Sequence, residues 1–252
     1  MDRRRNTKPH PLRTRDRTCR SAVGGPSRLA ETSKHNRATS PESAAAECAT
    51  LYSEELGIDL SSGHEADLFL WFLASLLFGQ RISETIARHT FASFVRHGLT
   101  SPQKILVAGW DYLVNPVMRE GGYVRYDESK SRKILSACHM LLEDYGGNLT
   151  RLHDMAADER DLEQRLLTFY GVGPITVNIF LRELRPFWRK ADPAPLPLVE
   201  AMARKLRVDL AVHPRKSLAF ARLEAGLLRR RHQLRGVFEQ PPGARTTRRK
   251  HP

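Results

Sequence analysis

The sequence predicts an all-helical protein. Apolar residues recur at helical spacing through most of the chain, whereas alternating runs of Val, Ile and Thr, which would indicate strands, are scarce. Hydrophobic residues make up 40% of the 252, which is enough for a sizeable core. We therefore expect an all-α globular region rather than a disordered chain.

The two ends differ in composition from the middle of the chain. Residues 1–43 hold 11 Lys/Arg against 4 Asp/Glu, residues 229–252 hold 8 against 1, and residues 44–228 have a net charge of −1. With few large apolar residues to offset the entropy of ordering, disordered basic tails are expected over 1–43 and 236–252. The total charge of +13 favours an acidic partner such as nucleic acid, and its location assigns that contact to the tails.

Between the tails, a folded domain is expected over 44–235. It begins with a helix over 43–56 that stops at Gly57. The apolar block Leu68–Phe78 has 11 residues, and because a membrane span needs roughly 20, a buried helix is expected. Further helices are expected over 82–95, from Pro102, over 127–145, and from Pro197 through Leu206.

The most informative segment is LEQRLLTFYGVGPITVNIFLREL, residues 162–184. Helical apolar faces flank a three-residue connection, Gly171-Val172-Gly173, and Pro174 takes the first position of the second helix. The glycines permit a positive φ and the close approach of a foreign backbone. Free N–H groups of this turn and helix start form a phosphate site that reads no sequence. The residues expected to contact DNA here are Gly171, Val172, Gly173, Ile175 and Thr176. An ordinary helix–turn–helix corner is the alternative interpretation.

Three segments, in this order, resemble the helix–hairpin–helix DNA glycosylase superfamily, the relatives of endonuclease III and the mismatched-adenine glycosylases. FLWFLASLLFGQRIS is similar to the family's first long helix and its alanine/serine-glutamine turn. GGYVRYDESKSRKILSACHMLLEDYGG is similar to a Gly-containing turn before a Lys/Arg-containing helix, and YGVGPIT to the hairpin. The resemblance covers roughly residues 45–210. It implies a two-lobed helical glycosylase-like fold, with lobe one at about 75–190 and lobe two formed by 44–74 and 191–235.

The resemblance implies a base-excision repair enzyme that flips a damaged or mismatched base out of double-stranded DNA and hydrolyses its N-glycosidic bond. In the family, a carboxylate about 20 residues beyond the hairpin glycines supports the positive charge that develops on the sugar, or activates water. Asp192 lies 19 residues after Gly173 and is the only acidic residue between Glu183 and Glu200. The resemblance therefore implies that Asp192 is the catalytic carboxylate. The alternative interpretation is a structural role, because an Asp before Pro is a common turn residue. The sequence also departs from the family pattern here, since the stretch PAPLP separates Asp192 from a helix that follows the Asp closely in relatives.

Two departures from the family pattern narrow the chemistry. Bifunctional relatives carry a nucleophilic lysine where this chain has Ile175, so lysine-type lyase activity is not expected. Three widely separated cysteines cannot ligate the iron–sulfur cluster of many relatives. No cofactor is expected, except that the resemblance implies a monovalent cation at the hairpin. A monofunctional glycosylase for an alkylated or mismatched base is the leading hypothesis, and a non-catalytic duplex-binding protein is the alternative.

Other residues are candidates for DNA contact. The resemblance implies that Gln80 enters the gap left by a flipped base or contacts the opposite strand. The alternative is that it is simply a polar residue at a helix end. Arg125 and Lys130 belong to a basic cluster that contacts phosphate or forms a solvated face. The ten histidines show no metal-ligand spacing, so no metal site is expected.

A monomer without membrane contact is expected. The predicted location is the cytoplasm, at the nucleoid, in a bacterium, and the nucleus or an organelle in a eukaryote.

Overall fold

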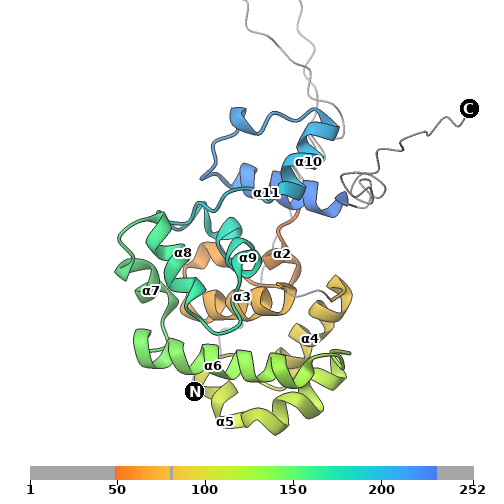
Figure 1. The fold of residues 1–252 in the computed structure, drawn as a ribbon, viewed down its shortest axis with the longest axis vertical. Helices are drawn as coiled ribbons and strands as arrows, with labels where there is room; N and C mark the ends of the chain where they lie inside the picture. The colour runs from red at the N-terminus through yellow and green to blue at the C-terminus, as the bar shows by residue number, and fades with distance from the viewer. Residues whose placement is uncertain (1–48, 80–81, 232–252) are drawn as a thin grey trace, which may run out of the picture. The chain divides into compact units, whose positions relative to one another are not determined.

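A computed structural model describes residues 49–79 and 82–231. In this part of the chain every regular element is helical, which confirms the all-helical prediction (Figure 1). The predicted tails and Gln80 lie outside the described residues. The helices are α2 Tyr52–Glu55, α3 Glu65–Phe78, α4 Glu84–Arg96, α5 Pro102–Tyr112, α6 Asp127–Tyr145, α7 Leu149–Met155, α8 Glu159–Leu167, α9 Pro174–Leu184, α10 Pro197–Leu206 and α11 Leu218–Arg229. Three further segments are not α-helical: the 3-10 helices η1 Leu60–Ser62 and η3 Leu210–Val212, and the π-helix η2 Leu113–Met118.

Local signals in the sequence set several helix boundaries. The Ser83 hydroxyl accepts the Ile86 N–H at 3.2 Å at the start of α4, and Ser101 caps α5 in the same way. Gly146, with φ +66°, ends α6 in the left-handed conformation that glycine adopts at little cost. These boundaries agree with the sequence analysis because caps and glycine stops are local in origin.

The helix at the start of the domain is shorter than predicted. Its described part, α2, is a single turn, and the Glu183 carboxylate accepts the N–H groups of Tyr52 and Ser53 at 3.0 and 2.9 Å. Glu183 is fully buried, and burial raises its pKa, whereas these two hydrogen bonds act to lower it. The short helix is therefore fixed by a carboxylate 130 residues away in the chain, which no local pattern reveals.

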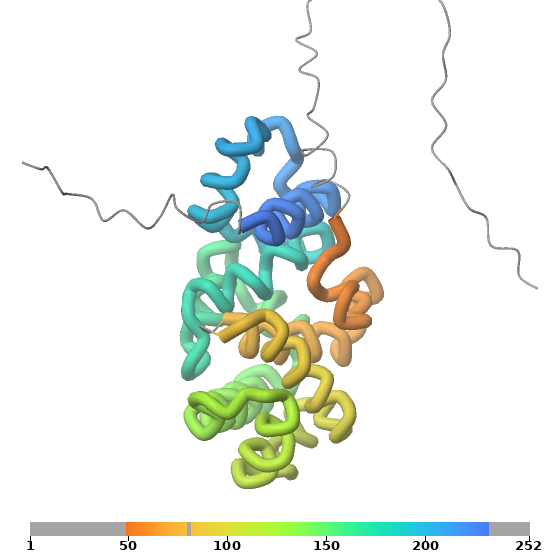
Figure 2. Tube along the Cα trace, turned by 90° about the vertical axis from the view of Figure 1, so that its right-hand side faces the viewer, coloured from red at the N-terminus to blue at the C-terminus, as the bar shows by residue number. Residues whose placement is uncertain are grey.

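Helix α3 is the element on which the hairpin is mounted. It packs against both α4 and α9 (Figures 1 and 2). The Trp71 indole N–H donates to the Phe180 carbonyl at 3.0 Å, and the Phe72 ring meets the rings of Phe169 and Phe180 edge-on at 5.5 and 5.4 Å. Since Phe169 lies before the hairpin glycines and Phe180 lies on the helix after them, α3 holds both sides of the hairpin.

The buried apolar residues form two clusters. The larger runs from Leu51 to Ala191 and includes Ala221 and Ala225 of α11, and the smaller joins α10 to the rest of α11. A lobe boundary at residues 74–75 would fall inside α3, whose two halves bury side chains in the same large cluster. The clusters separate after Ala191, at the position of the other expected lobe boundary, because α10 turns its apolar face to α11. No helix within 49–79 or 82–231 has the length and apolar character to cross a membrane.

Candidate functional site

The hairpin turn is longer than the sequence predicts. Helix α8 ends at Leu167, and six residues rather than three lead to α9. The Thr168 hydroxyl donates to the Arg165 carbonyl at 2.6 Å, a local bond that competes with continuation of the helix. Gly171 has φ +82°, and a Cβ there would lie 2.4 Å from Cδ of Lys133. Both the backbone angle and the neighbouring side chain therefore require glycine at position 171.

The second glycine has a different environment. Gly173 is the N-cap of α9, with an ordinary extended backbone (φ −112°), and a Cβ there would have no atom of the described residues within 4 Å. Nothing in the fold therefore demands glycine at this position. The space in front of Gly173 is open, as the approach of a phosphate backbone requires.

The N–H groups at the start of α9 are the available donors. The first hydrogen bond of the helix runs from the Val177 N–H to the Gly173 carbonyl at 3.0 Å. The N–H groups of Ile175 and Thr176 come before this bond and therefore have no acceptor within the helix. The Val172 N–H already donates to the Phe169 carbonyl at 3.0 Å, and its side chain is buried, which corrects its prediction as a free donor. The Thr176 side chain is also buried, beside Gly79, so only its N–H remains for a contact.

A cavity of about 250 Å³ adjoins the hairpin. Ile175, half-exposed on the first turn of α9, belongs both to the hairpin and to the cavity wall. The wall is predominantly apolar and includes the aromatic rings of Tyr52, Trp71 and Phe78. The remaining lining residues are Ile82, Glu84, Ala87, Ile179, Arg182, Leu196, Leu228 and Arg231.

Arginines surround the Tyr52 ring on the cavity wall. The guanidinium carbons of Arg229 and Arg182 lie 4.4 and 5.3 Å from the ring centroid, and that of Arg88 lies at 5.7 Å. At these distances each cation is attracted to the π-electrons of the ring. Arg182 is 6% exposed, and its Nε has no hydrogen-bond partner among the described residues. Burial lowers the pKa of this guanidinium.

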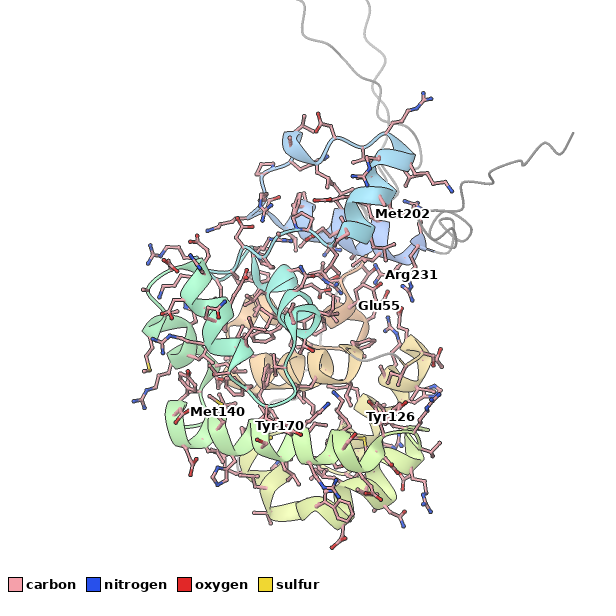
Figure 3. All side chains as sticks on the ribbon, in the orientation of Figure 1. Glu55, Tyr126, Met140, Tyr170, Met202 and Arg231 are labelled. Carbon is pink, nitrogen blue, oxygen red and sulfur yellow. The ribbon has the colours of Figure 1, made fainter. Side chains whose placement is uncertain are left out.

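Glu84 is the acidic residue on the cavity wall of the described structure. Its carboxylate accepts hydrogen bonds from Nη2 of Arg88 at 2.8 Å and Nη2 of Arg231 at 3.1 Å. Burial acts to raise the pKa of Glu84, but these bonds outweigh it and hold the pKa below its usual value. Arg88 also contacts Glu55, which Figure 3 labels near Arg231. Glu84 is thus ionised and paired at the edge of the cavity.

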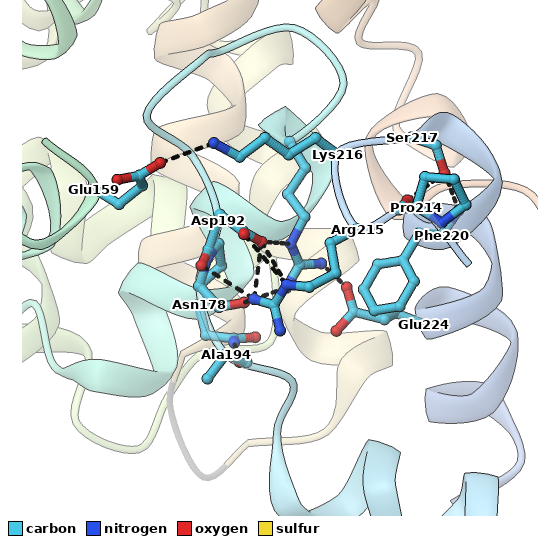
Figure 4. A network of polar contacts seen from close by, with 12 residues as sticks. Glu159, Asn178, Asp192, Ala194, Pro214, Arg215, Lys216, Ser217, Phe220 and Glu224 are labelled. Atoms are coloured by element: carbon cyan, nitrogen blue, oxygen red, sulfur yellow. Dashed lines mark hydrogen bonds and ion pairs between the residues drawn. The ribbon is translucent and has the colours of Figure 1, made fainter. Parts of the chain in front are cut away.

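Asp192 lies in a separate network that does not line the cavity (Figure 4). Its carboxylate accepts from Nη2 and Nε of Arg215 at 2.8 and 2.9 Å and from Nε of Arg185 at 3.2 Å. Arg185 is buried and also bonds Glu224 and the Pro193 carbonyl. The Asp192 side chain is 23% exposed, whereas that of Arg215 is 41% exposed. In this arrangement the carboxylate joins the segment before α10 to the segment before α11.

The basic cluster around the start of α6 is divided by burial. Arg125 is exposed, with its guanidinium over the Tyr126 ring at 5.1 Å, so it is accessible to phosphate. Lys130 is 2% exposed, and its ammonium donates to the Leu76 carbonyl near the end of α3. Burial lowers the pKa of Lys130 to about 7. The predicted phosphate contact of Lys130 is therefore corrected: this lysine binds a helix C-terminus.

The residues around Tyr52 and Glu84 were missed by sequence reasoning. One local signal exists, because Ile175, Ile179 and Arg182 follow one another at helical spacing and so place an arginine on an apolar face. The other charged groups come from α4 and from the end of α11, and only folding brings them together. No group of three or more His, Cys, Asp or Glu that could hold a metal ion occurs in the described residues.

Comparisons with protein-family models, with curated proteins and with solved structures give no match for this chain.

Proposed function

We propose that this protein binds double-stranded DNA through the hairpin and hydrolyses the N-glycosidic bond of a base extruded into the adjoining cavity. The observation that carries the proposal is the position of Ile175, shared by the hairpin and the cavity wall. A phosphate held at the N–H groups of α9 would have its nucleotide beside the cavity mouth. An extruded base would then meet aromatic and aliphatic side chains, which replace the stacking it loses.

Hydrolysis adds water to the anomeric carbon of the sugar, breaks the carbon–nitrogen bond, and releases the base with a proton from solvent. A carboxylate near the developing positive charge lowers the barrier. The resemblance implies Asp192 for this role. Because Asp192 does not line the cavity, it would have to meet the sugar outside the cavity wall, exchanging its contact with half-exposed Arg215 for the sugar. Ile175 has no amine, so the reaction would end at an abasic site without lysine-type strand cleavage.

Duplex binding without chemistry is the second candidate. It is favoured by the pairing of Asp192 with two guanidinium groups, one of them fully buried. A carboxylate neutralised in this way serves the fold as readily as it serves catalysis.

A base-release assay separates the two candidates. Duplexes carrying one damaged or mismatched base are incubated with excess protein, and abasic sites are then cleaved with alkali. We expect release by the wild-type protein and a loss of at least about a hundredfold in Asp192→Asn, with Arg215→Met retaining activity. Tight duplex binding with no release from any substrate would establish the second candidate.

The hairpin is tested by Gly173→Val, because the fold leaves room for the side chain while a phosphate backbone does not. We expect duplex affinity to fall about tenfold or more, with an unchanged melting temperature. Ala157→Val, in the exposed loop before α8, is the matched control and should bind like the wild type. Equal affinity of the two variants would contradict DNA binding through the hairpin.

A further inference from the structure

Arg182 is a buried cation without a hydrogen-bond acceptor for its Nε among the described residues. The neighbouring Glu183 carboxylate attracts the charge of Arg182, but it accepts its hydrogen bonds from the N–H groups of Tyr52 and Ser53. The guanidinium instead lies against the Tyr52 ring and lines the cavity. A desolvated donor without an acceptor is costly. Nε itself is covered by protein, so the acceptor of a cavity ligand would meet the part of the Arg182 guanidinium that lines the cavity and would gain binding energy there.

The charges on the cavity wall are unequal. Two guanidinium groups, Arg182 and Arg231, and one carboxylate, Glu84, belong to the lining. Glu84 is bonded by Arg231 and also by Arg88, so it offers little attraction to an incoming cation. The guanidinium carbon of Arg229 lies 4.4 Å from the centroid of the Tyr52 ring, but Arg229 is paired with Glu55 and adds little to this balance. A ligand in this cavity therefore experiences a positive potential.

We propose that the cavity selects neutral bases that present carbonyl oxygens, and rejects bases with a positively charged ring. The carbonyl oxygen accepts from Arg182, while the flat face of the base packs on the aromatic and aliphatic wall. The proposal rests on the proposed function, since it assumes that the cavity receives an extruded base. It narrows the substrate class to oxidised or deaminated bases and excludes cationic N-alkylated bases. The cavity, at about 250 Å³, falls below the roughly 300–1,000 Å³ typical of drug-sized ligands, which suits a single base.

The test compares pairs of lesions of similar size that differ in charge and in the carbonyl oxygens that they present. One pair is 8-oxoguanine and 7-methylguanine, each opposite cytosine, and the other is uracil and 3-methylcytosine, each opposite guanine. In each pair the first base is neutral and the second carries a positive charge. Affinity is measured with the full chain carrying Asp192→Asn, so that turnover does not consume the duplex. We expect the neutral lesion of each pair to bind at least about tenfold more tightly than the cationic one.

Arg182→Met should abolish this preference while leaving the affinity for undamaged duplex unchanged. Arg182→Lys keeps the charge and should retain part of the preference. Arg165→Met is the matched control, because Arg165 is half-buried on α8, is ion-paired with Asp161 and does not line the cavity. Equal or tighter binding of the cationic lesions by the parent protein would overturn the proposal without any variant. An unchanged preference for neutral lesions in Arg182→Met would overturn the proposal as well.

Failure of the proposed function has a different signature. A chain that binds no duplex, damaged or undamaged, contradicts DNA binding itself, and the selection by Arg182 falls with it. Base release confined to the cationic lesions in the wild-type protein would leave the glycosylase proposal standing and remove only the selection by Arg182.

Discussion

Two buried arginines, Arg182 and Arg185, lie on either side of Glu183 and Leu184 and have opposite environments. Arg185 is bonded to Asp192, Glu224 and the Pro193 carbonyl, so its charge is fully compensated. The Nε of Arg182 has no such partner in the described chain and lies beside a cavity. A buried donor without a hydrogen-bond acceptor is costly, so we assign Arg185 to the fold and Arg182 to the proposed ligand contact.

Lys130 gives a prediction for the pH dependence of stability. Its pKa is about 7 in the folded chain against an ordinary value of 10.5, so between these values the unfolded chain binds more protons than the folded one. The free energy of unfolding should therefore rise with pH above 7, by up to about 1.4 kcal/mol per pH unit, and this contribution should level off below 7.

Urea unfolding at pH 7, 8 and 9 measures this slope. Lys130→Met should lose it, whereas Lys104→Met, at an exposed position, should keep it. An identical slope in the wild type and in Lys130→Met would show that Lys130 ionises normally in the fold.

At the scale of elements, the hairpin uses its two glycines for different reasons. Gly171 is required by its positive φ and by its closeness to Lys133, whereas Gly173 has ordinary backbone angles and open space around it. The first glycine belongs to the packing of the turn against α6. The packing of the fold does not explain the second glycine, so we assign Gly173 to the proposed phosphate contact at the N-terminus of α9.

A pair of alanine variants separates these two roles. Gly171→Ala should lower the free energy of unfolding by about 1–3 kcal/mol, because it forces a side chain into a left-handed backbone and against Lys133. Gly173→Ala should change it by less than about 0.5 kcal/mol. Chemical denaturation of both proteins checks this, and equal decreases in stability would contradict the distinction.

At the scale of the whole molecule, charge and fold are separated along the chain. The net charge of +13 resides in residues 1–43 and 229–252, while residues 44–228 carry −1. Non-specific attraction to DNA is therefore expected mainly from the ends of the chain, and positioning from the hairpin and cavity.

The dependence of duplex affinity on salt tests this division. Replacing Arg245, Arg248, Arg249 and Lys250 by Gln should weaken binding and flatten the log–log salt slope by up to about 0.9 for each phosphate that these side chains neutralise in the wild type. The control replaces four exposed basic residues of the middle region, Lys104, Arg119, Arg151 and Arg160, and should leave the slope nearly unchanged. A larger effect in the control would place the attraction on the folded part.

Prediction from the sequence succeeded where the signal was local. The start of α5 at Pro102, the end of α6 at Gly146 and the buried face of α10 follow from caps, glycine stops and helical spacing. It failed where a distant group intervened. The single turn of α2 depends on Glu183, and the burial of Lys130 depends on a carbonyl of α3, so neither could be anticipated from neighbouring residues.

The sequence by itself determined the helical class, the hairpin with Pro174 at the start of α9, and the separation of basic ends from a nearly neutral middle, because each follows from local spacing or composition. Only the tertiary structure decided that Asp192 is paired with two arginines while Arg182 lines a cavity beside the hairpin. The physical reason is that the ionic partners of a side chain come from elements far apart in the sequence. Whether a charge is compensated or left for a ligand is therefore settled only when those elements pack.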